Sequence, residues 1–235
     1  MEHTAEFRKM LDRYGKLSYI RPSMLPDIEL YMDQLTTFMD QHLEGQKRYP
    51  DDKILTKTMI NNYTKNNLLP PSDKKKYSQE HLLLLIFIYY LKNILSISDI
   101  QSLLKPMTER FFDNPDADRD LKSIYRDIVS QENSMFRSFY RDIIGKVNMA
   151  EKSFTDAPDD EKEYLQNFSM VCMLAFDVYL KKQMIETLID DMNDREKARS
   201  ETEKAKKPDK KAARAEAAKE KAAAKKQAAA ESEQQ

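Results

Sequence analysis

The chain has 235 residues, a formal net charge of −1, three glycines and a charged share of 34%. That share exceeds the roughly 25% of a typical globular domain, so part of the chain is expected to lie outside any packed core. Few glycines and many Leu, Lys, Glu and Ala residues argue against a turn-rich β architecture and favour an all-α fold. The longest apolar run, 82–91, is short of the roughly 20 residues of a membrane span, and no signal peptide is expected, so a cytoplasmic protein without a membrane partner is predicted.

An N-terminal segment, 1–24, is mostly polar and is expected to contain a short helix. Pro26 and Asp27 then precede apolar residues at helical spacing, which predicts a helix over 27–43. Gly45 and a later proline interrupt this pattern, so a loop is expected after the helix.

A short helix is predicted over 57–66, because Thr56 is a good N-cap and Ile60 and Tyr63 share one face. Asn67 stands where this helix should end, and Asn tolerates the left-handed backbone that many helix ends adopt. Two leucines then turn back toward the core, and the two prolines after them prevent any continuation of the helix.

The next helix, "QEHLLLLIFIYYLKN", follows the N-cap residue Ser78 and is apolar almost all round, so it is expected at the centre of a domain. Ser96 with Asp99 three residues later is close to a capping box and predicts another helix, which is expected to end before Pro106.

A helical domain is predicted over 116–192, with helices at 117–133, 134–148 and 159–192. Whether the last of these is broken near its middle is left open. Large apolar residues recur at helical spacing in the domain 116–192. They are Phe136, Phe139, Tyr140, Phe168, Met170, Met173, Phe176, Tyr179 and Met184. They are interpreted as a core or a dimer seam, and an effector pocket for a small molecule or a protein is the alternative. The last helix keeps no strict heptad, so no coiled coil is predicted, and Cys172, in an apolar run, is expected in the core.

The remaining residues, 193–235, are rich in Lys, Ala and Glu and contain no large apolar side chain. Such a segment cannot bury a face of its own. A disordered tail, or a solvated and partly helical extension, is therefore expected.

Residues 25–108 are predicted to form, in order, a helix, a loop, a short polar-faced helix, an abrupt stop, a basic loop and a buried helix. This order is typical of a winged helix-turn-helix. The segment 57–66 is the expected recognition helix, since an Asn amide can both donate to and accept from adenine in the major groove. The basic loop 72–77 is the expected wing, with lysines that contact phosphate. The predicted DNA-binding residues are Lys57, Thr58, Asn61, Asn62, Lys65, Lys74, Lys75 and Lys76.

The segment "MINNYTKNNLLPPSDKKKYSQEHL", followed by "SISDIQSLL", resembles the MerR-type DNA-binding domain. The positions that match the family pattern are Tyr63, Leu68, Leu69, Pro70, Tyr77, Ser78, Ser96 and Ile100. The chain departs from that pattern in four places. Asn61 and Asn62 stand where an Arg-Tyr pair is usual, Asn67 replaces a glycine, the wing is short and without arginine, and the loop before the recognition helix is long.

The phrases "LTKTMINNY" and "KKYSQEHL" resemble still more closely a bacterial family known as domain of unknown function 1836, over about residues 25–190. The resemblance implies a transcription regulator with a MerR-like domain and a helical C-terminal part. Duplex DNA is then the expected partner, and a homodimer is expected because such proteins commonly bind two half-sites. The alternative is a protein-interaction module that kept the scaffold and lost DNA binding.

Signals of an enzyme are missing from the sequence. The three histidines, His3, His42 and His81, share no ligand spacing, and no Gly-rich phosphate loop is present. The chain is therefore predicted not to be an enzyme and to need neither a metal nor a cofactor.

Overall fold

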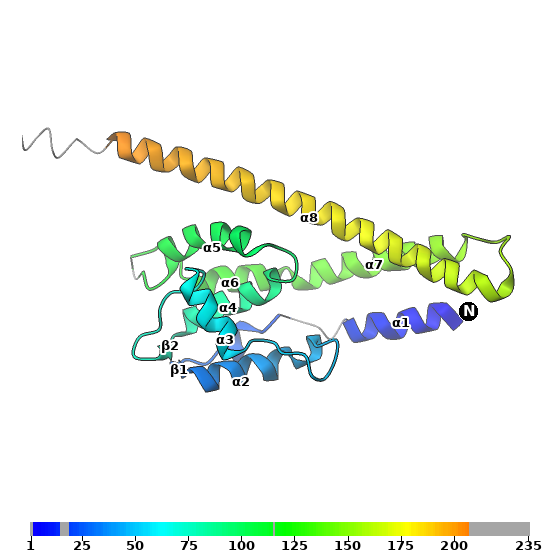
Figure 1. Cartoon of the computed structure of the whole chain (residues 1–235), viewed down its shortest axis with the longest axis horizontal. Helices are drawn as coiled ribbons and strands as arrows, with labels where there is room; N and C mark the ends of the chain where they lie inside the picture. The colour runs from blue at the N-terminus through cyan, green and yellow to red at the C-terminus, as the bar shows by residue number, and fades with distance from the viewer. Residues whose placement is uncertain (1, 15–18, 115, 207–235) are drawn as a thin grey trace, which may run out of the picture. The chain divides into compact units, whose positions relative to one another are not determined.

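The computed structural model describes residues 2–14, 19–114 and 116–206, and they are mostly helical (Figure 1). Contacts divide the chain into Met1–Ile189 and Asp190–Gln235, and the packing described below lies within the first unit. The helices are α1 (Glu2–Tyr14), α2 (Met32–Leu43), α3 (Lys57–Lys65), α4 (Gln79–Leu91), α5 (Ile97–Phe111), α6 (Leu121–Ser130), α7 (Glu132–Glu151) and α8 (Asp159–Lys206). Two short strands, β1 (Leu30–Tyr31) and β2 (Lys76–Tyr77), form one antiparallel sheet.

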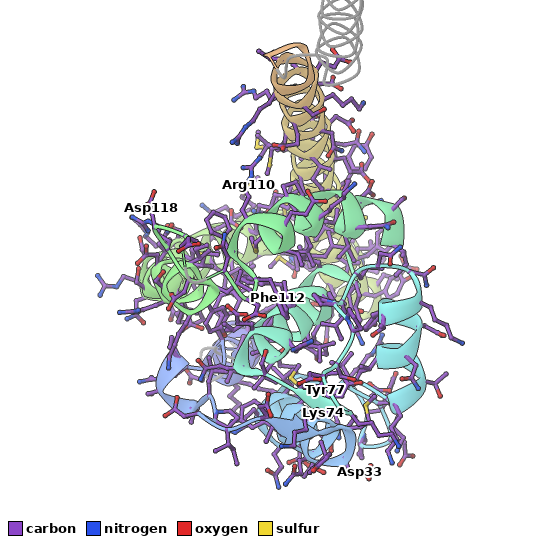
Figure 2. All side chains as sticks on the ribbon, turned by 90° about the vertical axis from the view of Figure 1, so that its left-hand side faces the viewer. Asp33, Lys74, Tyr77, Arg110, Phe112 and Asp118 are labelled. Atoms are coloured by element: carbon purple, nitrogen blue, oxygen red, sulfur yellow. The ribbon has the colours of Figure 1, made fainter. Side chains whose placement is uncertain are left out.

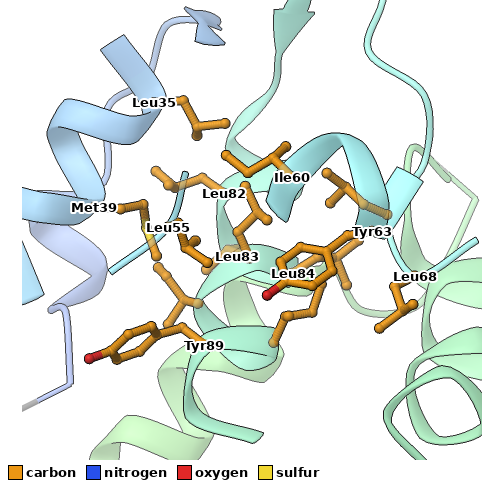
Figure 3. Close-up of a cluster of buried hydrophobic side chains, with 14 of the residues drawn as sticks. Leu35, Met39, Leu55, Ile60, Tyr63, Leu68, Leu82, Leu83, Leu84 and Tyr89 are labelled. Atoms are coloured by element: carbon orange, nitrogen blue, oxygen red, sulfur yellow. The ribbon is translucent and has the colours of Figure 1, made fainter. Parts of the chain in front are cut away.

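Helix α4 lies at the centre of the main core, as its apolar sequence predicts. Residues 82–86 are all buried, and α2, α3, α5 and α6 contribute apolar side chains around them. Figure 3 shows Leu35 and Met39 of α2 and Ile60 of α3 beside the leucines of α4. Each fully buried aliphatic side chain contributes about 1.5–3 kcal/mol relative to an exposed one. This core therefore fixes the orientation of α3.

Helix capping follows the sequence closely. The Ser78 hydroxyl caps α4, and Ser96 with Asp99 forms the expected capping box at the start of α5. In that box the Asp99 backbone N–H donates to the Ser96 hydroxyl at 3.1 Å. The predictions for these two helix starts are confirmed.

The predicted start of the first long helix, 27–43, is wrong at its N-terminal end. Helix α2 begins at Met32, because Leu30 and Tyr31 form strand β1. Leu30 pairs with Tyr77, and Tyr31 pairs with Lys76, so the strand depends on a partner more than 40 positions away. The loop after α2 also contains a short 3₁₀ turn at Glu44–Gln46.

Helix α5 does not end before Pro106 but continues through it to Phe111. Proline removes one backbone donor and strains the preceding turn, which costs about 3 kcal/mol in a helix interior. Met107 and Phe111, both beyond the proline, pack against the main core. Their burial offsets the cost, and the helix continues.

The helices predicted at 117–133 and 134–148 are α6 and α7, with shifted bounds, since Asp120 caps α6 at Leu121. Tyr125 of α6 is buried in the main core, and its hydroxyl donates to the Ile20 carbonyl at 2.6 Å. Helix α8 is continuous, with no break near its middle. Residues 193–206 of the expected tail are helical, and the prediction for 207–235 lies outside the described residues.

A second cluster joins α1, α7 and α8 through Leu11, Ile143, Val147, Ala150 and Met170. Beside it lies a cavity of about 360 Å³ that is lined mainly by apolar side chains of these three helices. The effector pocket stays a prediction.

Cys172 is exposed, so its expected place in the core is wrong. It follows the buried Met170 by two positions, and two helical positions span about 200°. Cys172 therefore lies on the opposite side of α8 from the second cluster.

Candidate nucleic-acid interface

Helix α3 is anchored through its N-cap and its buried side. The Thr56 hydroxyl accepts a hydrogen bond from the Met59 backbone N–H at 3.2 Å. Ile60 and Tyr63 are buried in the main core. Because they lie three positions apart, they occupy one side of the helix and turn the other side toward solvent.

The C-terminal end of α3 stops abruptly, as its sequence predicts. The Asn66 side-chain amide donates to the Asn62 carbonyl at 2.8 Å, and Asn67 adopts a left-handed φ of 55°. The Leu68 backbone N–H then bonds to the Tyr63 carbonyl at 2.9 Å. Leu68 is buried, so the chain turns back to the core within two residues.

The solvent side of α3 carries every DNA-binding residue that the sequence predicts for this helix. The exposed set is Lys57, Thr58, Asn61, Asn62 and Lys65. Within the described part of the chain, the side-chain amides of Asn61 and Asn62 make no hydrogen bond. Lys57 and Lys65 lie at opposite ends of the helix, about 12 Å apart along its axis. The face is therefore polar, with its two amides free to bind an external group.

The basic loop is a tight turn. The Lys76 backbone N–H donates to the Asp73 carbonyl at 2.8 Å, and Lys74 and Lys75 have φ values of 47° and 67°. Two successive positive φ values are the pattern of a type I′ turn, for which Asn-Gly is the favoured sequence. A left-handed backbone costs about 1–2 kcal/mol at a non-glycine residue. The turn is therefore strained, and it presents both lysine side chains to solvent.

The expected wing over 72–77 is not a hairpin of two paired strands. An isolated bridge between Asp73 and Lys76 closes the turn, and β2 pairs with β1 instead. This pairing places the turn beside the N-terminal end of α2, in the region where Figure 2 labels Asp33, Lys74 and Tyr77.

Two of the predicted lysines are paired with acids that the sequence reasoning missed. Lys57 forms an ion pair with Asp33, and the Lys76 ammonium lies 3.5 Å from a carboxylate oxygen of Glu29. The same ammonium lies 5.9 Å from the ring centre of Tyr31, which is also exposed. Thr58, Asn61 and Lys65 lie farther along α3. The site therefore combines a polar helix face with a mixed-charge edge.

His81 joins the base of the turn to the core. Its Nδ1 accepts from the Ser78 backbone N–H at 3.1 Å, so Nε2 carries the hydrogen and donates to the Pro71 carbonyl at 3.3 Å. The ring meets Tyr77 and Phe112 edge-on. Burial lowers the pKa of His81. The neutral ring is thus the form that these contacts accommodate.

In the described part of the chain, no group of three or more His, Cys, Asp or Glu residues is arranged to hold a metal ion. The side chain of His3 lies outside that part. Among residues 2–14, 19–114 and 116–206, no helix combines the length and the apolar character that crossing a membrane requires.

No curated protein and no solved structure matches the chain. A family match covers β1 to most of α6, which includes the whole candidate interface, and it ends before α7 and α8. Residues 20–128 are similar to the family described as "Domain of unknown function (DUF1836)".

Proposed function

We propose that the protein binds duplex DNA sequence-specifically as a transcription regulator, with the solvent face of α3 in the major groove. The domain would act as a winged helix-turn-helix of the MerR-like type, with the Asp73–Lys76 turn in the position of the wing. Helix α3 has nine residues and is about 13 Å long, and an α-helix of about 10–12 Å diameter fits the roughly 12 Å wide major groove.

The observation that carries the proposal is the pair of free amides on a fixed helix. Asn61 and Asn62 are exposed, while Ile60 and Tyr63 hold the helix against the core. An Asn side chain can bind the N6 and N7 edge of adenine with one donor and one acceptor. Because the core holds the helix, both amides project from one fixed face, as sequence reading requires.

The lysines supply contacts that position the protein without reading sequence. Lys65, Lys74 and Lys75 are exposed, and no described acid lies within ion-pair distance of them. The strained turn also favours a role for its side chains, because non-glycine residues in left-handed conformations persist where the surrounding structure holds them, often at functional sites. Lys57 and Lys76 would add phosphate contacts only by leaving Asp33 and Glu29.

The test is fluorescence anisotropy with duplexes selected from a random library and with unrelated duplex as competitor. We expect Asn61→Ala/Asn62→Ala to lose the preference for the selected sequence and to keep salt-sensitive nonspecific binding. Lys74→Gln/Lys75→Gln should weaken binding to all duplexes and reduce the salt slope by about 2, one unit for each lost phosphate contact.

The matched control is Lys105→Gln/Lys152→Gln, which removes the same charge from exposed positions elsewhere. If the turn variant and this control bind alike, the turn does not contact phosphate. If no duplex is enriched and the asparagine variant binds as the wild type does, the proposal fails.

A second candidate is a protein-binding module on the same scaffold. The observation that favours it is the pairing of Lys57 with Asp33 and of Lys76 with Glu29, which lowers the free positive charge. A protein-binding module would bind a protein from a cell extract and would not bind duplex DNA. The Asn61→Ala/Asn62→Ala variant should bind that protein as the wild type does. This result would support the second candidate over DNA binding.

A further inference from the structure

Helix α8 has an apolar stripe on the side away from the second cluster. Its members follow one another at intervals of four, three, four and four residues, which is close to heptad spacing. They are Tyr164, Phe168, Val171, Ala175 and Tyr179. The sequence pattern hides this stripe, because residues of the buried side, such as Met170 and Met173, interrupt it.

The stripe is open to solvent in the single chain. Tyr164 is 69% exposed, Phe168 54%, Val171 61% and Tyr179 56%. The buried Met170 lies on the opposite side of the helix, so α8 is apolar on two sides and only one is covered. Two apolar sides on one helix indicate two packing partners.

The stripe is complementary to itself when two copies of α8 run antiparallel. If the two-fold axis passes between Val171 and Cys172, then Phe168 of each copy meets Ala175 of the other. A large side chain thus lies opposite a small one on both sides of the axis, as an isologous interface requires. The axis also places the exposed Cys172 side chains close to each other.

The same axis pairs the ends of the stripe. Tyr164 meets Tyr179 of the second copy, and Glu161 comes opposite Lys182. The N-terminal end of α8 carries four acids and one lysine over 159–163, whereas Lys181 and Lys182 follow the stripe. A parallel arrangement would set acids against acids. When the helices are antiparallel, the acids of one copy therefore attract the lysines of the other. Lys182 also lies 3.3 Å from Glu186 of its own helix.

The size of the stripe suits a specific but modest interface. Three aromatic residues of about 150–250 Å² each, slightly more than half exposed, offer roughly 350 Å² per copy. Val171, Ala175 and Cys172 extend this surface. Two copies together approach the roughly 1,000 Å² that separates specific interfaces from incidental contacts.

Two other occupants fit the stripe less well. The chain after α8's apolar part, 193–235, has no large apolar side chain with which to cover it. A lipid surface is disfavoured by the acids at 159–163, because membrane-binding helices carry Lys and Arg beside their apolar face.

We infer that a second copy of this chain docks on the Tyr164–Tyr179 stripe of α8, antiparallel, about a two-fold axis between Val171 and Cys172.

Sedimentation of the full chain over a concentration series tests the association. We expect a monomer–dimer equilibrium that Phe168→Asp weakens more than about tenfold, because each dimer would bury two unpaired carboxylates. Met184→Asp is the matched control, since Met184 is 68% exposed and lies off the stripe. Both side chains are exposed in the single chain, so unchanged circular dichroism is expected.

Spin labels test the orientation. In Cys172→Ala/Glu163→Cys, labels at position 163 should lie about 25 Å apart along the axis if the helices are antiparallel. Parallel helices would bring them to the roughly 10 Å of helix packing. A short distance between the labels, a wild type that stays monomeric, or equal weakening by Phe168→Asp and Met184→Asp would each overturn the inference.

Discussion

Replacement of Lys74 by Asn and Lys75 by Gly should stabilise the fold and weaken DNA binding at the same time. Both lysines have left-handed backbones, with φ values of 47° and 67°. Asn-Gly is the sequence that a type I′ turn favours. The change therefore removes strain from the turn and removes two charges from its tip.

The gain in the free energy of unfolding can be estimated for each position. Relief of the left-handed conformation at Lys75 is worth about 1–2 kcal/mol. Glycine at position 75 lowers this gain by about 0.5–1 kcal/mol, because it gives the unfolded chain more conformational freedom. Asn at position 74 tolerates the conformation better than Lys, without that loss. A net gain of about 1 kcal/mol is expected, which raises the Tm by about 2–4 °C for a chain of this size.

Thermal and urea unfolding at neutral pH measure the gain, and Lys53→Gly is the control. Lys53 is exposed in a loop and has no positive φ, so glycine there should lower stability by about 0.5–1 kcal/mol. Salt-dependent anisotropy then measures the loss of phosphate contacts by the turn variant.

Equal destabilisation by the turn variant and by Lys53→Gly would refute the claim that the turn is strained. If the turn variant is more stable but binds DNA as the wild type does, the wild-type turn is strained, and its lysines do not contact DNA.

Three further changes test other contacts. Asp33→Asn frees Lys57 and removes a repulsive charge, so nonspecific duplex binding should tighten by up to about fivefold in anisotropy, since exposed ion pairs are worth about 0.2–1 kcal/mol. Burial lowers the pKa of His81 in the folded chain below its value in the unfolded chain. As the pH falls, the unfolded chain is therefore protonated at a higher pH than the folded chain. The stability that His81 contributes is complete above about pH 6.5 and is lost as the pH falls below that value. The difference between the urea midpoints of the wild type and His81→Gln should therefore shrink from about pH 7.5 to pH 5.5, and a constant difference would contradict this. Tyr125→Phe leaves the Ile20 carbonyl without its donor and should cost about 1–3 kcal/mol in urea unfolding, and a change below the error of the measurement would contradict this.

Local signals account for the parts of the fold that the sequence predicts well. The apolar run of α4 and the caps Thr56, Ser78 and Ser96 all depend on residues within one helical turn of each other. The left-handed Asn67 likewise follows from its own side chain and the adjacent stop. Such features need no knowledge of distant contacts.

The errors arise where distant contacts decide the local structure. Strand β1 has only two residues and forms because Tyr77 and Lys76 pair with it. Pro106 stays inside α5 because Met107 and other residues beyond it reach the core. Neither outcome follows from a single stretch of sequence.

In the candidate interface too, the features that depend on local sequence can be predicted and those that depend on distant contacts cannot. The exposed face of α3 can be predicted, since Ile60 and Tyr63 mark the buried side within the helix itself. The acids beside it cannot be predicted, because Glu29 reaches Lys76 through the β1–β2 pairing and Asp33 reaches Lys57 through the packing of α2 with α3.

The salt dependence of duplex binding measures the effect of these acids. Each neutralised phosphate contributes about 0.9 to the slope of log affinity against log salt, so three unpaired lysines give about −2.7 per copy and five give about −4.5. A slope near the smaller magnitude means that Asp33 and Glu29 keep their lysines in the complex. A slope near the larger one means that phosphate displaces them, and Asp33→Asn should then raise affinity without changing the slope. If Asp33→Asn steepens the slope by about one unit instead, Lys57 is held away from DNA in the wild type, and the packing of α2 beside α3 limits nonspecific binding.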